Sequence, residues 1–332
     1  MSRKYENAFF AFGLIVLAIM VSQLSFDEVW QGLQRAGYWF FAVVFLWAFL
    51  YLFNTSAWWL ILRSQNGDGK EVSFWWLYKL TVSGFALNYA TPGGLMGGEP
   101  YRIMSLAPIV GTERASSSVI LYAMTHIFSH FWFWLISIPL FILTQPVSLP
   151  MAGMLALIGG FCTLGIWFFA TGYKKGFAQR LLQLLRHLPL VKRWAVPFLE
   201  QHKQQLDAID LRIATLHKQN PRTFYSAVGL ELACRLCSAT EIFFILLVLM
   251  PSADYVQCIL ILAFTSLFAN MLFFMPLQLG GREGGFLMSA AGLGLSTGAG
   301  IFTALIVRLR ELVWTGIGLL LIKLEKKKSQ KV

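Results

Sequence analysis

Uninterrupted apolar stretches of about 20 residues recur along the chain and dominate its hydrophobic pattern. A stretch of that length allows a helix to cross the hydrocarbon core of a bilayer, whereas a soluble core shows polar residues interleaved at helical or strand period. Because lipid offers the backbone no hydrogen-bond partner, we expect an all-α polytopic membrane protein. The predicted complete crossings are residues 8–26, 38–62, 115–144, 149–171, 224–250 and 299–322.

Two further apolar segments are interrupted by dense glycine and proline. Residues 72–112 carry Thr-Pro-Gly-Gly-Leu-Met-Gly-Gly-Glu at 91–99, and residues 257–297 carry Met-Pro-Leu-Gln-Leu-Gly-Gly-Arg-Glu at 275–283. Proline removes a backbone donor and glycine weakens a helix interior, so both patterns break a helix. We predict two re-entrant helical hairpins at these segments in place of simple crossings.

The positions of the basic residues indicate the orientation of the crossings. The chain carries 27 Lys and Arg against 16 Asp and Glu, and ten of the basic residues lie in 174–222 with five more in 323–331. The connections 145–148 and 251–256 carry none. By the positive-inside rule, both termini are expected on the cytoplasmic side of the cytoplasmic (inner) membrane. Because the net charge of +11 is concentrated in such loops, we expect no nucleic-acid partner.

The same reasoning gives the two hairpins opposite sidedness. Residues 63–71 and the Glu113-Arg114 pair both have cytoplasmic character, so 72–112 is expected to enter and return on that side. Residues 257–297 begin at a loop without basic residues and precede a crossing that runs inward to the basic tail. This second segment is therefore expected to re-enter from the opposite face.

The two hairpins also share sequence at an offset of 184. Seven of the seventeen positions from 91 to 107 are identical, namely Pro92 with Pro276, Leu95 with Leu279, Gly97 with Gly281, Glu99 with Glu283, Met104 with Met288, Ser105 with Ser289 and Ala107 with Ala291. We therefore predict one integral membrane domain over 1–332, built from an inverted-topology repeat of 38–144 and 224–322. Such repeats place a binding site near the membrane midplane, where broken helices meet.

Residues 172–223 are the one sizeable polar part of the chain. Phe177, Leu181 and Leu188 follow one helical stripe with Arg180 and Arg186 nearby, as in a helix that lies on an anionic inner leaflet. We predict a cytoplasmic amphipathic helical insert here, which serves either as a solvated linker or as a regulatory surface.

Ionisable residues inside the apolar segments need a partner, water or a function. Arginines bind phosphate through paired hydrogen bonds, and helix N-termini that follow glycine breaks add backbone N–H donors. The predicted substrate-binding residues are Glu99, Arg102, Arg282, Glu283, Arg308, Arg310, Gly97, Gly98, Gly280 and Gly281. The candidate supporting residues are Glu231, Arg235, Glu241, Glu311 and Lys79.

Structural roles compete with these functional ones. Glu231 and Arg235 are four residues apart, so they are neighbours on a helix face and can form a purely structural ion pair. Lys79 either snorkels toward the cytoplasm or contacts a headgroup. His126 and His130 are better explained as core or interface residues than as metal ligands, because no third ligand is evident nearby.

The chain carries no recognisable pattern for catalysis. No Gly-Lys-Ser/Thr follows the glycine runs, so no ATP site is indicated. Neither a Gly-x-Ser-x-Gly elbow nor a His-Glu-x-x-His helix occurs. We expect no catalytic residue, no metal and no cofactor.

The motif at 92–99, the span end Trp-Trp-Leu-Ile-Leu-Arg at 58–63 and the second glycine and glutamate break at 280–285 resemble the lysylphosphatidylglycerol synthase transmembrane, or flippase-like, family. The resemblance covers nearly the whole chain, although leucine and glutamine at 277–278 replace the usual glycines. It implies a membrane domain that moves lipids across the bilayer. Some members carry a cytoplasmic aminoacyl transferase, an activity we do not expect because the chain ends soon after its last crossing.

The expected function is translocation of an anionic phospholipid, or of a polyprenyl-phosphate glycan, across the inner membrane. The arginines hold the phosphate, and the acyl or prenyl chains stay in lipid. The carboxylates bind a cationic headgroup, orient the arginines or accept coupling protons. Two alternatives stay open, namely a membrane-embedded transferase or phosphatase acting on polyprenyl-phosphate substrates and a non-transporting partner of an envelope glycosyltransferase.

Overall fold

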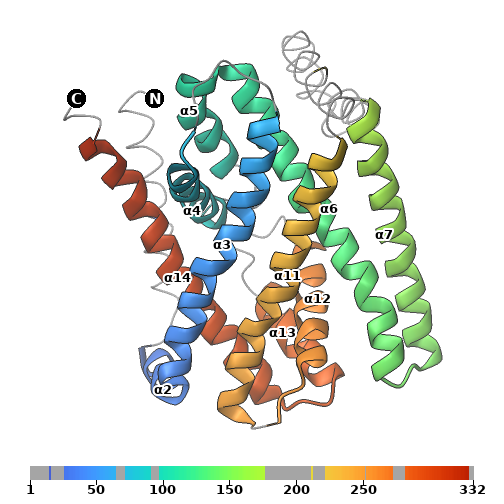
Figure 1. Ribbon diagram of the computed structural model, residues 1–332. Coiled ribbons are helices and arrows are strands. Elements are labelled where there is room, and N and C mark those ends of the chain that lie inside the picture. The colour runs from blue at the N-terminus through green and yellow to red at the C-terminus, as the bar shows by residue number, and fades with distance from the viewer. Residues whose placement is uncertain are drawn as a thin grey trace.

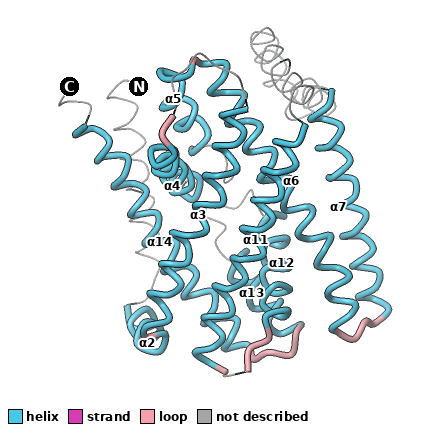
Figure 2. The backbone as a smooth tube through the Cα atoms, viewed as in Figure 1, coloured by secondary structure: helices cyan, strands magenta, loops and turns pink. Residues whose placement is uncertain are grey.

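The computed structural model describes residues 15, 26–64, 72–90, 97–175, 211, 221–250, 252–271 and 281–328. Every regular element within these residues is a helix, which confirms the all-α prediction (Figures 1 and 2). The helices are α2 (Phe26–Ala36), α3 (Tyr38–Ser64), α4 (Phe74–Ala90), α5 (Gly98–Val110), α6 (Thr112–Thr144), α7 (Leu149–Lys175), α11 (Pro221–Leu249), α12 (Tyr255–Met271), α13 (Gly281–Gly292) and α14 (Thr297–Lys328).

Four of the predicted crossings correspond to helices that are long and apolar enough to span a bilayer. Within the described residues these are Tyr38–Ser64, Thr112–Thr144, Leu149–Thr171 and Arg222–Leu249. The predicted crossing 299–322 lies within α14, which has 32 residues but carries Arg308, Arg310 and Glu311 near its middle. The number of crossings therefore stays a prediction.

Two predicted segments lie mostly outside the described residues. Of the predicted first crossing 8–26, only residues 15 and 26 are described. Of the predicted insert 172–223, the structure describes residue 211 and the two ends, where 172–175 complete α7 and 221–223 begin α11.

Two pairs of short helices occupy the segments that were predicted to form hairpins. The pair α4 and α5 lies toward one end of the molecule, and the pair α12 and α13 lies toward the opposite end (Figure 1). Between these pairs, α3 and α11 pack together and run in opposite directions. This placement is the one expected of hairpins with opposite sidedness, although their entry into a bilayer stays a prediction.

The second half of the molecule repeats the helix order of the first. Helices α3, α4, α5 and α6 begin at 38, 74, 98 and 112, and helices α11, α12, α13 and α14 begin at 221, 255, 281 and 297. The differences are 183, 181, 183 and 185, which bracket the offset of 184 read from the sequence. The helix bounds thus have the spacing that the predicted internal repeat requires.

Helix α2 is an amphipathic element that the sequence pattern did not reveal, because its 11 residues contain no long apolar run. Val29 and Leu33 pack against the core cluster that contains Ala36. Gly32 allows close approach to α14, since a Cβ there would lie 2.7 Å from Leu305 Cδ2. Gly37, with φ of 54°, then turns the chain into α3.

Glycines bring the two helices of the first pair into backbone contact. A Cβ on Gly98 would lie 2.2 Å from the carbonyl oxygen of Gly84 and 2.6 Å from Asn88 Oδ1. Small residues at a helix interface permit this approach in membrane proteins, where packing and polar contacts replace the hydrophobic driving force. Gly98 is therefore a packing residue of the α4–α5 pair.

We predict that Gly98→Ala destabilises the protein by about 1–3 kcal/mol, because the added methyl group forces α4 and α5 apart. Gly160→Ala is the matched control, since nothing lies within 4 Å of a Cβ at that exposed position of α7. The control is expected to leave stability unchanged or slightly raised. Thermal unfolding in detergent measures both, and equal melting temperatures for the two variants would contradict the packing role.

Candidate functional site

A cavity of about 680 Å³ lies between the two helix pairs and is lined by four of the ten predicted substrate-binding residues and four of the five supporting ones. Side chains from α3, α4, α5, α6, α7, α11, α12, α13 and α14 line it. Its charged lining residues in the described part of the chain are four arginines and four glutamates, namely Arg102, Arg235, Arg282, Arg310, Glu99, Glu231, Glu241 and Glu311. The structure thus brings charged residues of both halves to one space, and their formal charges balance.

Arg102 of α5 is almost fully enclosed, with 1% of its side chain exposed. Its Nη1 lies 3.2 Å from Glu99 Oε1, and its Nη2 donates to the carbonyl oxygen of Thr81 at 3.2 Å. The guanidinium also lies 4.7 Å from the ring centroid of Phe85, which favours a cation. Gly84 makes room for it, because a Cβ there would lie 2.3 Å from Arg102 Nε.

Asn88 joins the end of α4 to the start of α5. Its Nδ2 donates to Glu99 Oε1 at 3.0 Å, and its Oδ1 accepts from the backbone N–H of Gly98 at 2.7 Å. The second bond satisfies one of the free donors at the helix N-terminus. Sequence reasoning missed Asn88, although an amide directly before a glycine break was a usable signal.

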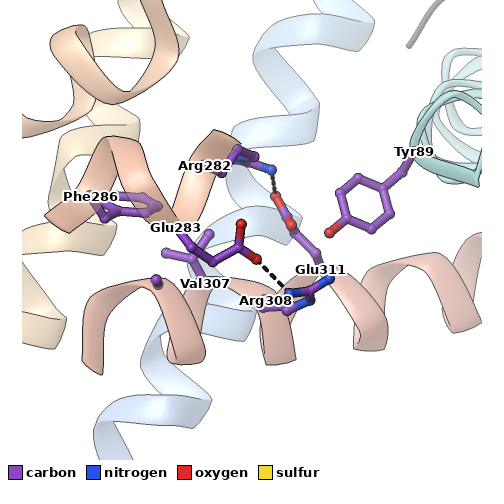
Figure 3. A pocket seen from close by; sticks show the side chains of 8 residues that line it. Tyr89, Arg282, Glu283, Phe286, Val307, Arg308 and Glu311 are labelled. Carbon is purple, nitrogen blue, oxygen red and sulfur yellow. Dashed lines mark hydrogen bonds and ion pairs between the residues drawn. The ribbon is translucent and has the colours of Figure 1, made fainter. Parts of the chain in front are cut away.

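The corresponding cluster on α13 and α14 consists of two ion pairs (Figure 3). Arg282 pairs with Glu311, and Arg308 Nη1 lies 2.5 Å from Glu283 Oε1. Tyr89 of α4 points its hydroxyl group toward this cluster from the other half of the molecule. These residues also line a void of about 10 Å³, which has room for about one water molecule.

Arg310 of α14 is bound in a fixed position by α3 and α11. Its Nε and Nη2 donate to Glu241 Oε1 and Oε2 at 2.7 and 2.8 Å, a bidentate pair in which both side chains are buried. Its guanidinium carbon lies 3.9 Å from the ring centroid of Trp47, whose Nε1 donates to the same carboxylate at 2.9 Å. Arg310 therefore connects helices, and its donors are less available to a ligand than the sequence suggested.

Glu231 of α11 is bound by residues that the sequence did not connect with it. Asn54 Nδ2 donates to both carboxylate oxygens at 2.9 and 3.0 Å, and His126 Nδ1 lies 2.7 Å from Glu231 Oε2. Arg235 instead donates to Ser129 Oγ at 2.8 Å and to the carbonyl oxygen of His126 at 2.9 Å. The interpretation of Glu231 and Arg235 as an ion pair is wrong, because both side chains have better-placed partners on α3 and α6.

The remaining predicted residues lie in different surroundings. Gly97 is buried directly before the first residue of α5, and Gly281 is the buried first residue of α13. Gly280 lies outside the described residues. Lys79 is exposed on α4 and lines neither the cavity nor the small void, so the structure does not place it with the other candidate residues.

We predict that Arg310→Met destabilises the protein by about 3–5 kcal/mol, because it leaves the carboxylate of Glu241 buried without its cation. The double variant R310M/E241M is expected to recover much of this loss, since it removes both charges. Lys79→Met is the control for loss of an exposed charge. Thermal unfolding in detergent distinguishes these cases, and a melting temperature of the Arg310 variant equal to that of the control would argue against the fixed pair.

Comparison with known proteins identifies the family. No curated protein and no solved structure gives a significant match. The family described as lysylphosphatidylglycerol synthase TM region matches residues 8–318, which is nearly the whole chain. This match agrees with the glycine-rich breaks and the long apolar helices. The chain belongs to the lysylphosphatidylglycerol synthase TM region family of membrane domains.

Proposed function

We propose that this protein translocates a phosphate-bearing lipid headgroup, that of an anionic phospholipid or a polyprenyl-phosphate glycan, across the cytoplasmic membrane. The observation that carries the proposal is a cavity of about 680 Å³ lined by charged residues from both helix pairs. Pockets of roughly 300–1,000 Å³ accommodate small polar ligands, and a lipid headgroup is of that class.

The charge pairs of the cavity supply the binding chemistry. Arg102 and Arg282 each face a carboxylate, Glu99 and Glu311 respectively. A phosphate that enters takes the place of the carboxylate as the partner of the guanidinium, because both anions accept paired hydrogen bonds. Glu99 Oε2 has no hydrogen-bond partner among the described residues and is the natural acceptor for a cationic part of the headgroup.

Two apolar residues of the cavity lining are also exposed on the molecule. These are Phe161 of α7 and Met271 of α12, which are 53% and 65% exposed. We infer that acyl or prenyl chains stay in the bilayer beside these residues while the headgroup occupies the cavity. This arrangement favours a lipid substrate over a fully soluble one.

The opposite placement of the two helix pairs provides the route. We take α4–α5 as entering from the cytoplasmic face and α12–α13 as entering from the outer face, with both termini cytoplasmic. Inverted repeats of this kind open a central site alternately to the two sides. The headgroup then passes from one pair to the other without crossing bare hydrocarbon.

We predict that Arg282→Gln and Glu99→Gln each slow translocation of an anionic lipid analogue by at least about tenfold, the effect of about 1.4 kcal/mol at the transport barrier. Arg282 is chosen because Arg310 also lies 3.6 Å from its partner Glu311. Removal of the Arg282 charge therefore does not leave the Glu311 carboxylate without a cation. Dithionite quenching of fluorescent phosphatidylglycerol in reconstituted vesicles measures the rate.

Asp254→Asn is the matched control, since Asp254 is exposed, lies outside both cavities and accepts from the backbone N–H of Val256 through an oxygen that asparagine also has. Its translocation rate is expected to equal that of the unchanged protein. Unimpaired translocation by both cavity variants would refute the site.

The sidedness of the helix pairs has its own test. Thr112 and Thr297 are the exposed first residues of α6 and α14, and they directly follow the two helix pairs. In a variant without other cysteines, we expect Thr112→Cys to react with an impermeant maleimide only from the cytoplasmic side and Thr297→Cys only from the outside. Labelling of both from the same side would exclude an inverted repeat.

A further inference from the structure

One carboxylate of the cavity differs from the others in the kind of partner it has. Glu99, Glu241 and Glu311 each lie within 4 Å of an arginine, which stays charged at all accessible pH values. Among the described residues, the ionic partner of Glu231 is His126. A histidine, unlike an arginine, can be either neutral or charged, so this pair differs from the others in that its cationic partner is not permanently charged.

The geometry allows a proton to reach this pair. Glu231 is 1% exposed, whereas His126 is 25% exposed and lines the cavity. With Glu231 ionised, His126 Nδ1 carries a hydrogen and donates it to the carboxylate, so Nε2 is the nitrogen that takes up a further proton. The proton comes from water in the cavity, and the carboxylate stabilises the imidazolium that forms.

The charged and titratable groups around His126 come from several helices. Glu231 and Arg235 contact it from α11, where Cys234 faces Glu231, and Tyr122 and His130 lie on its own helix, with ring centroids 6.3 and 5.5 Å away. Helix α3 contributes Asn54, the second partner of Glu231, and α4 contributes the ring of Phe85 at 5.7 Å. From α5, Arg102 and Glu99 face Tyr122 as a neutralised pair.

A proton on His126 changes the net charge of the cavity. Four arginines and four glutamates line the cavity, so its formal charge is zero when His126 and His130 are neutral. One proton on His126 changes this to +1. Arg235 donates to Ser129 Oγ and to a backbone carbonyl beside the same pair, and it is also attracted by Glu231. The extra positive charge therefore arises next to a second cation, with Glu231 as the carboxylate that both share.

We propose that the His126–Glu231 pair is a proton-binding site that makes the cavity cationic, so that a proton and a phosphate-bearing anionic headgroup bind together. This inference rests on the proposed function for its substrate class. Binding is reciprocal by thermodynamic linkage: the proton strengthens binding of the anion, and the anion promotes uptake of the proton. A translocator with this coupling moves the headgroup together with the proton.

The offset of 184 residues between the two halves of the chain supports the assignment of His126 as the residue that binds the proton. At the offset of 184 between the two halves, His126 corresponds to Arg310 and Glu231 corresponds to Trp47. Arg310 and Trp47 are also in contact, since the guanidinium carbon lies 3.9 Å from the ring centroid. The position that holds a permanent cation in one half therefore holds a titratable one in the other. The proton on His126 supplies in the first half the charge that Arg310 supplies at all times in the second.

The test measures binding of short-chain phosphatidylglycerol to the purified full chain in detergent at about pH 5 and about pH 8, which bracket the titration range of histidine. We expect affinity to be about tenfold higher at the lower pH, a coupling of ordinary size, with net proton uptake on binding near neutral pH. Zwitterionic phosphatidylcholine is the control probe and is expected to bind with little pH dependence. Equal phosphatidylglycerol affinity at both pH values, or an equal pH dependence for both lipids, would overturn the proposal.

Two variants assign the effect to His126. His126→Gln is expected to bind phosphatidylglycerol weakly at both pH values, and His126→Arg to bind it tightly at both, because its charge is permanent. A pH dependence retained in either variant overturns the assignment. If neither variant folds, the proton uptake of the unchanged protein decides alone, and its absence rejects the site.

The two proposals fail separately. Proton-linked lipid binding without translocation in vesicles would reject the transport function and leave the proton site standing. Translocation that proceeds equally at both pH values, with no proton uptake on binding, would reject the proton site and leave the transport function standing.

Discussion

The compensation of buried charge is the constraint on which the arrangement of this protein depends. A charged group in an apolar interior requires an opposite charge or hydrogen-bond partner, because an unpaired one costs several kcal/mol. Arg310 and Glu241 meet this requirement between α14 and α11, and Arg282 and Glu311 meet it between α13 and α14. These pairs determine which helices adjoin, since each side chain can be buried only where its partner is. The cavity is the space around which the pairs converge.

Much of the fold was predictable from the sequence, because a helix that spans lipid must be long and apolar and because glycine and proline interrupt it. The bounds of α3, α6, α7 and α11 follow from run length, and α5 and α13 begin within the predicted breaks at 91–99 and 275–283. Helix α2 was not predictable in this way. Its short amphipathic pattern is stabilised by contact with α14, through Gly32 and Leu305, which no local pattern reveals.

The charged residues that line the cavity were predictable, but their pairings were not. A charge in an apolar segment is conspicuous, so the sequence identified all eight charged residues that line the cavity. Spacing along the helix suggested that Glu231 pairs with Arg235, yet its partner His126 is 105 residues away. Long-range partners depend on how helices pack. Asn54 and Trp47 were missed for the same reason, since they contribute only through contacts made in the folded chain.

A balanced cavity is better suited to transport than a group of unpaired arginines. Unpaired guanidinium groups in a dry cavity would bind phosphate so tightly that release would limit the cycle, whereas passage requires a site that a ligand both enters and leaves. In the proposed transport cycle, a carboxylate competes with the ligand for Arg102 and another for Arg282, and each pair re-forms on release. The bidentate bond of Arg310 to Glu241 excludes Arg310 from this proposed exchange and links α11 to α14. The same kind of ion pair therefore serves two purposes, and the difference lies in geometry: Arg310 donates two hydrogen bonds to Glu241, whereas Arg102 and Arg282 each donate one to their carboxylates.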